Sequence, residues 1–110
     1  MEVKSKVWLE NRGKIFFGAG RSLLLKAIKE TGSINKAAKI MNMSYRRAWS
    51  QIHSAEDSLG LPLLIRNKGG KDGGGAVLTD YAEELLKKFE KLQQQALLFT
   101  NRRYQQIFHT

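Results

Sequence analysis

The sequence contains no cysteine among its 110 residues, a single proline and only ten acidic side chains. Without cysteine the chain forms no disulfide, thiolate metal site or cysteine nucleophile, which is compatible with a reducing compartment. The N-terminus lacks the apolar stretch of a secretory signal peptide, and no apolar run approaches the roughly 18 residues of a membrane span. From the sequence alone we therefore expect a cytoplasmic protein.

The scarcity of acidic residues leaves the chain strongly basic. Its 19 lysine and arginine residues give a net charge of +9 and an isoelectric point near 10.0. Such a field attracts polyanions, meaning nucleic acid or an anionic membrane surface, although charge alone says nothing about fold. The hydrophobic fraction of 42% is ordinary for a globular protein, and the length predicts one domain spanning residues 1–110.

Residue groups that could support catalysis are also scarce. The two histidines, His53 and His109, lie far apart in the sequence. The acidic pairs Glu56-Asp57 and Glu83-Glu84 occupy helical surface positions, where solvated carboxylates are the simpler interpretation. Gly18-Ala19-Gly20 lacks the third glycine of a dinucleotide-binding fingerprint. We therefore expect no enzyme, no cofactor and no metal site.

The arrangement of apolar residues predicts an α+β domain that is mainly helical. Two β-prone runs within residues 3–17 flank Asn11-Arg12-Gly13, a typical turn sequence, so we expect an N-terminal β-hairpin. Beyond it, apolar residues recur at intervals of three and four, which is the spacing of an amphipathic helix. The helices predicted from this spacing cover residues 21–31, 34–42, 45–59 and 80–100.

The helices over residues 34–42 and 45–59 form a predicted helix-turn-helix unit. Ser33 and Ser44 stand where they can cap the two helices, and Ala37-Ala38 is small enough for the helices to cross closely. Such a unit places its second helix in the major groove of DNA, with the N-terminal residues of that helix against the bases. The alternative is an ordinary three-helix bundle whose charged face meets water.

The start of the 45–59 helix carries the residue types that read DNA. Arginine can donate two hydrogen bonds to guanine and glutamine can pair with adenine, whereas serine and tyrosine donate to phosphates. No acidic residue, which phosphates would repel, occurs from Thr31 to Ala55. Trp49 neighbours the apolar stripe and is expected in the core, and His53 is interpreted as an exposed residue without a role. The residues expected to contact DNA here are Ser33, Ser44, Tyr45, Arg46, Arg47, Ser50 and Gln51.

A strand, a glycine-rich tip and a returning strand are predicted over residues 63–68, 69–75 and 76–78, which together describe a wing. Half of the ten glycines lie in the tip, where the backbone could approach a phosphate or enter a minor groove. A surface loop without a ligand fits the same composition. The basic residues expected to contact DNA in the wing are Arg66, Lys68 and Lys71.

The helix predicted over residues 80–100, which Thr79 can cap, has apolar residues in a heptad-like spacing. At 1.5 Å per residue such a helix is ~30 Å long and outgrows a domain of this size. We expect it to pair with its equivalent in a second copy, giving a homodimer that recognises an inverted repeat. The alternative is that it packs on the 21–31 helix of its own chain. The expected dimer-interface residues are Leu85, Phe89, Leu92, Ala96 and Phe99, and residues 101–110 form a tail with no predicted structure.

Several of these segments resemble known families. The stretch from Gly32 to Ser44 resembles the helix-turn-helix of LysR-type regulators, and Leu59 to Arg66 is similar to the end of their recognition helix and the start of the wing. The hexapeptide Ser44-Tyr45-Arg46-Arg47-Ala48-Trp49 is more specific and resembles the N-terminal domain of the ModE family of molybdate-responsive regulators. The resemblance covers residues 5–95 and implies a winged helix-turn-helix fold, operator binding and a homodimer.

ModE proteins also carry C-terminal oxyanion-binding domains, for which this chain has no room. We therefore do not expect it to bind molybdate by the family's usual site.

The sequence predicts a sequence-specific transcriptional regulator that binds double-stranded DNA. The alternative is a non-specific, architectural nucleic-acid-binding protein, and Tyr45-Arg46-Arg47 with Gln51 favours base reading. A membrane-surface role is disfavoured because Glu83, Glu84 and Glu90 dilute the nearby lysines.

Overall fold

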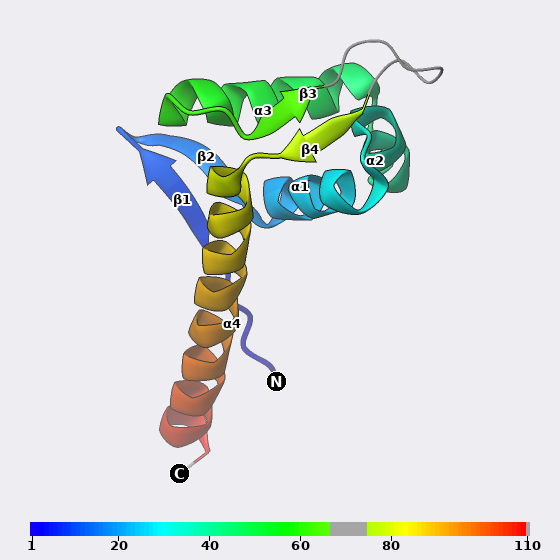
Figure 1. The fold of residues 1–110 in the computed structure, drawn as a ribbon. Helices are drawn as coiled ribbons and strands as arrows, with labels where there is room; N and C mark the ends of the chain where they lie inside the picture. The colour runs from blue at the N-terminus through cyan, green and yellow to red at the C-terminus, as the bar shows by residue number, and fades with distance from the viewer. Residues whose placement is uncertain (67–74, 110) are drawn as a thin grey trace.

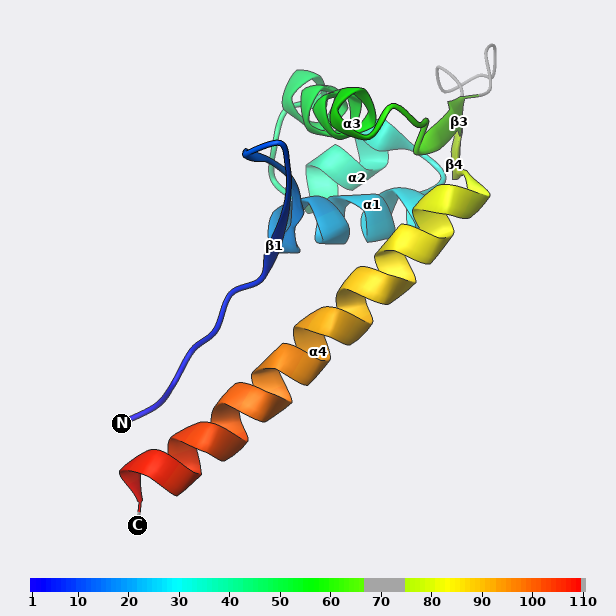
Figure 2. The ribbon, with the colours of Figure 1, turned by 90° about the vertical axis from the view of Figure 1, so that its left-hand side faces the viewer.

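The computed structural model describes residues 1–66 and 75–109, in which two small antiparallel sheets and four helices are arranged as Figure 1 and Figure 2 show. The mainly helical α+β architecture predicted from the sequence is confirmed. The N-terminal hairpin pairs β1 (Trp8–Asn11) with β2 (Lys14–Gly18), and the wing pairs β3 (Leu64–Arg66) with β4 (Ala76–Leu78). The helices are α1 (Ala19–Thr31), α2 (Ile34–Ile40), α3 (Tyr45–Leu59) and α4 (Asp80–Phe108).

The predicted boundaries of α3 and β4 agree with the structure, whereas several others shift. The hairpin strands begin at Trp8 rather than at residue 3, and α1 begins at Ala19 rather than at residue 21. Helix α2 ends at Ile40, two residues early, because Asn42 adopts a left-handed backbone conformation with φ of 56°. The strand predicted over residues 63–68 is described only as far as Arg66, and most of the predicted tip falls outside the described residues.

The largest correction concerns the C-terminal tail. Helix α4 continues through Phe108, so residues 101–108 of the tail for which the sequence predicts no structure are helical. Residues 101–108 contain no glycine or proline, and their arginine and glutamine residues are good helix formers. Among the described residues, no helix is both long enough and apolar enough to cross a membrane.

The hydrophobic core lies between the hairpin, α1, α2, α3, the base of the wing and the first three turns of α4. Phe17 of β2 and Phe89 of α4 pack edge to face, with ring centroids 5.1 Å apart. Helix α1 lies at the centre because it contacts α2, α3, α4, β2 and β4. The largest fully buried side chains are those of Phe17, Leu24, Leu25, Ile28, Ile52, Leu63 and Phe89.

Thr79 joins the wing to the long helix. Its hydroxyl donates to the carbonyl of Pro62 at 2.9 Å and accepts from the backbone N–H of Ala82 at 3.1 Å, which caps α4. Its own N–H donates to the carbonyl of Leu63 at 3.0 Å. These three hydrogen bonds fix the direction in which α4 leaves the domain, and its far half extends beyond the other helices (Figure 2).

The structure divides the predicted apolar seam of α4 into two parts. Phe89 is only 1% exposed and belongs to the core of its own chain, so the prediction that placed it in a dimer interface is corrected. Leu85 is half-buried and also packs against the core, as the alternative of a self-packed seam predicts. Farther along, Ala96 is half-buried, whereas Leu92 and Phe99 are 46% and 65% exposed. Spacing alone could not separate these parts, because both follow the same heptad.

We expect Phe89→Ala to lower the free energy of unfolding by about 3–5 kcal/mol, since it removes a buried ring and leaves a cavity against Phe17. Leu98→Ala is the matched control, because Leu98 is a large apolar residue of the same helix that is 58% exposed. Urea denaturation of the two variants measures the difference. Equal stabilities would show that α4 does not close the core at Phe89.

Candidate nucleic-acid interface

The first turn of α3 is fixed by a side-chain cap. The hydroxyl of Ser44 accepts a hydrogen bond from the backbone N–H of Arg47 at 3.1 Å, as the sequence predicts for an N-cap serine. Farther along the helix, a buried face is formed by Ala48, Ile52 and Ala55. Because a helix turns by about 100° per residue, burying this face turns the opposite side of α3 to solvent.

Two arginines occupy the exposed side of this first turn. Arg46 and Arg47 are both exposed, and the preceding Tyr45 is 50% exposed. Within residues 1–66 and 75–109, neither arginine side chain takes part in a salt bridge or a side-chain hydrogen bond. The fold therefore presents two exposed guanidinium groups at a capped helix end, an arrangement suited to binding an anionic or base-edge acceptor.

Three other predicted DNA contacts differ in their positions. Ser50 is exposed one turn after Arg46 and Arg47. Ser33 is half-buried and caps α2, because its hydroxyl accepts from the backbone N–H of Lys36 at 3.1 Å. Gln51 is half-buried and lines an open groove beside the hairpin together with Arg21. Of these three residues, Ser50 is thus the one that shares the outward side of α3 with the arginines.

Arg21 shows how the hairpin is joined to α1 beside Gln51. Its guanidinium donates to the carbonyl of Ile15 in β2 at 3.1 Å. Partial burial lowers the pKa of Arg21 below the ordinary value of an arginine. The guanidinium group still remains protonated at neutral pH, as arginine does in proteins generally. This contact supports the base of the hairpin close to the groove that Gln51 lines.

Trp49 connects α3 to the wing. Predicted in the core, it is half-buried at the edge of the core, where its indole stacks on His53 with ring centroids 4.5 Å apart. The guanidinium carbon of Arg66 lies 5.5 Å from the centroid of the Trp49 ring, a cation–π contact. Arg66 is thereby held beside α3, which the sequence did not indicate because the two residues are distant in the chain. The predicted contacts Lys68 and Lys71 lie outside the described residues.

Glu56 has a structural function that the sequence did not reveal. Its carboxylate accepts hydrogen bonds from the backbone N–H groups of Leu63 at 2.8 Å and Leu64 at 3.4 Å. Likewise Glu83 accepts from Lys29 at 2.7 Å, and this hydrogen bond raises the pKa of Lys29 above its ordinary value. The interpretation of both acidic pairs as simply solvated is therefore wrong for Glu56, which fixes the start of β3, and for Glu83, which ties α4 to α1.

Comparisons with known proteins agree with this arrangement. The family model for bacterial regulatory helix-turn-helix proteins of the LysR family matches residues 22–83. Transcriptional regulator ModE of Haemophilus influenzae is 46% identical over 79 residues, which cover 72% of this chain and 31% of that protein. The DNA-binding transcriptional dual regulator ModE of Escherichia coli is 37% identical over 94 residues, covering 86% of this chain and 36% of that protein.

Among solved structures, the complex of the CbnR DNA-binding domain with DNA superposes with a TM-score of 0.61. The two chains are 24% identical, and the match covers 76% of this chain and 90% of that one, so the likeness concerns the fold. The chain spans about a third of the length of the ModE relatives it matches. The prediction of a ModE-like, LysR-type helix-turn-helix domain is confirmed by these matches.

We expect Glu56→Ala to lower the free energy of unfolding by about 1–3 kcal/mol, because two backbone N–H groups at the base of the wing lose their acceptor. Asp57→Ala is the control, since the neighbouring Asp57 is exposed and, among the described residues, its carboxylate has a single salt-bridge neighbour, His53 at 3.8 Å. Thermal unfolding of both variants measures the effect. If Asp57→Ala proved as destabilising as Glu56→Ala, Glu56 would have no special function at the wing.

Proposed function

The chain belongs to the LysR family of bacterial regulatory helix-turn-helix proteins, and from this premise we propose that it recognises an inverted DNA repeat as a homodimer. Its LysR-type helix-turn-helix is the DNA-binding domain of transcriptional regulators, which are not enzymes. In the proposed complex, α3 of each copy lies in the major groove, with Arg46 and Arg47 facing base edges. The observation that carries this proposal is the capped start of α3, which presents both arginines to solvent.

Other groups around α3 are proposed to contact the sugar–phosphate backbone. Ser44 and Tyr45 carry hydroxyls beside the arginines, and hydroxyls commonly donate to phosphate oxygens. Arg66, held over Trp49, stands on the wing side of α3 and supplies a charge there. Lys68 and Lys71 remain predicted contacts. The net charge of +9 favours approach to a polyanion such as DNA. In the proposed function, the regulator acts in the cytoplasm, where its operator lies.

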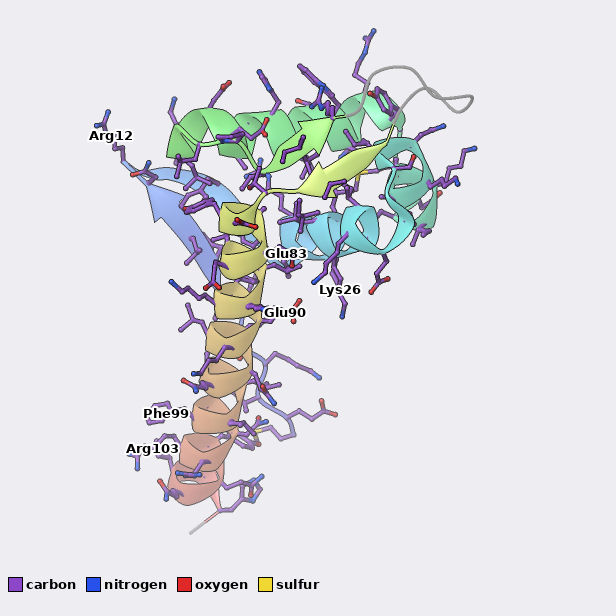
Figure 3. The ribbon with its side chains drawn as sticks, in the orientation of Figure 1. Arg12, Lys26, Glu83, Glu90, Phe99 and Arg103 are labelled. Atoms are coloured by element: carbon purple, nitrogen blue, oxygen red, sulfur yellow. The ribbon has the colours of Figure 1, made fainter. Side chains whose placement is uncertain are left out.

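The far half of α4 supports the proposed dimer. With 29 residues, α4 is about 43 Å long, and its last turns lie beyond the helix-turn-helix (Figure 2). Leu92 and Phe99 lie seven residues apart, so they share one side of the helix, and both are exposed. Phe99 and Arg103 point to the same side of α4 in Figure 3, away from Glu83 and Glu90. An apolar stripe on a helix that outgrows its domain suits a second copy of the same helix.

For specific recognition, we expect selection from a random DNA pool to enrich an inverted repeat. On the enriched duplex, Arg46→Ala or Arg47→Ala should weaken binding by about 1–3 kcal/mol if the arginine reads a base. Lys26→Ala is the charge-matched control, because exposed Lys26 lies on α1 away from the outward side of α3 (Figure 3). A pool with no enriched sequence would instead indicate an architectural DNA-binding protein. Unchanged affinity in both arginine variants would show that the start of α3 does not recognise bases.

For dimerisation, we expect Phe99→Glu to give a monomer in analytical ultracentrifugation, because it places a charge in the centre of the proposed helix pair. Leu98→Glu is the control: Leu98 is also exposed, but it lies about 100° around the helix from Phe99. The unmodified chain and Leu98→Glu should sediment as dimers. A Phe99→Glu protein that sediments with the unmodified chain would contradict the proposed interface.

A further inference from the structure

We infer that the N-terminal hairpin is a second DNA-contacting arm, which binds phosphates on the side of α3 opposite the wing. This inference rests on the proposed function, in which α3 lies in the major groove. Its elements are Arg12 and Lys14 of the hairpin and a row of serines on α3, Ser50, Ser54 and Ser58. We call this set the hairpin-side surface.

The hairpin and α3 also share a second hollow on the surface, separate from the groove that Gln51 lines. The hollow has a volume of about 470 Å³, with Lys14 and Ile15 on the hairpin side. On the helix side it is lined by the three serines together with Trp49, His53 and Asp57. The serines follow each other at intervals of four residues, so they lie one above the other along one side of α3. Lys14 thus stands across the hollow from Ser50, which is itself a predicted DNA contact.

The position of the hairpin turn is fixed relative to α3. The side-chain amide of Asn11 donates to the carbonyl of Ser58 at 2.7 Å, which ties the turn to the last turn of the helix. Arg12 follows in the left-handed conformation, with φ of 53°, and is exposed. Figure 3 shows Arg12 at the tip of the hairpin, close to the level of α3 and pointing away from the core. Its guanidinium therefore extends the outward surface of α3.

The dimensions of DNA explain why the position of the hairpin beside α3 matters for binding. A helix with its side chains is about 10–12 Å across and fills a major groove about 12 Å wide, so a phosphate chain runs along each side of it. Figure 2 shows α3 between the hairpin on one side and the wing strands on the other. Arg66 stands on the wing side, and Arg12 with Lys14 stands on the hairpin side. Each flanking phosphate chain thus meets its own basic arm.

The chemistry of the hairpin-side surface matches a phosphate chain better than a base edge. Lysine, arginine and serine hydroxyls are common donors to phosphate oxygens, and such contacts carry no sequence information. Two carboxylates are close. Asp57 lines the same hollow and lies 3.8 Å from His53 Nε2, and Glu10 in β1 accepts a hydrogen bond from the Trp8 indole at 2.7 Å. The hairpin cations themselves have no carboxylate within salt-bridge distance among the described residues.

The test removes the two hairpin charges without disturbing the turn. Asparagine tolerates the left-handed conformation and Lys14 is exposed, so the variant is Arg12→Asn with Lys14→Gln. The control, Lys26→Gln with Lys87→Gln, removes the same charge from exposed sites on α1 and α4. Binding is measured against salt concentration on a mixed-sequence duplex and on the duplex enriched from the pool. Thermal unfolding verifies that both variants are folded.

We expect the salt dependence of binding to become shallower in the hairpin variant, by about one unit of slope for each phosphate that the hairpin no longer neutralises, on both duplexes. The control should keep the slope of the unmodified chain. In a phosphate-ethylation interference experiment, ethylation of the phosphates beside the hairpin should weaken binding of the unmodified chain and of the control. It should no longer do so in the hairpin variant. If the hairpin variant matched the control while Arg46→Ala still weakened binding, the inference alone would be overturned. If Arg46→Ala and Arg47→Ala also had no effect, the proposed function would fail with it.

Discussion

The outward presentation of the arginines depends on the burial of three small or branched side chains on the other side of α3. Ala48, Ile52 and Ala55 are each no more than 1% exposed, and together they fix the rotation of the helix about its axis. Once that rotation is fixed, the side chain of Arg46 has no place except solvent, and the Ser44 cap determines where the helix begins. Within the described part of the chain, the side chains of Arg46 and Arg47 take no part in a salt bridge or hydrogen bond that holds this arrangement, so their guanidinium groups are available for a partner.

The same constraint connects the reading helix to the long helix. Helix α3 packs on α1, and α1 also contacts α4, while Phe17 and Phe89 close the core between the hairpin and α4. Thr79 and the Lys29–Glu83 ion pair add polar contacts at the base of α4. The helix-turn-helix and the base of the long helix are therefore packed into one unit around a shared core. In a dimer built on α4, the distance between the two α3 helices would be set by this unit, and with it the spacing of the two half-sites.

Much of this could be predicted from the sequence because local signals agreed with each other. Ser44, the apolar spacing of residues 48–55 and Gly60 predict both ends of α3 correctly, and the two short wing strands follow from their turn residues. The features that were missed depend on contacts between distant segments. The acceptor function of Glu56 and the stacking of Arg66 on Trp49 require the wing to fold back on α3. The heptad of α4 shows that Phe89 must be buried, but periodicity cannot say whether its partner is the same chain or a second copy.

Contact between α3 and DNA is the interaction on which the proposed function depends most, and an NMR titration of the isotope-labelled chain with the enriched duplex tests it directly. We predict that the backbone amides from residue 44 to residue 50 show the largest chemical-shift changes, with smaller changes around Arg12, Lys14 and Arg66. The amides of the far half of α4 should remain unchanged once the dimer has formed. Changes confined to α4, with residues 44–50 unaffected, would contradict a DNA-reading function for α3.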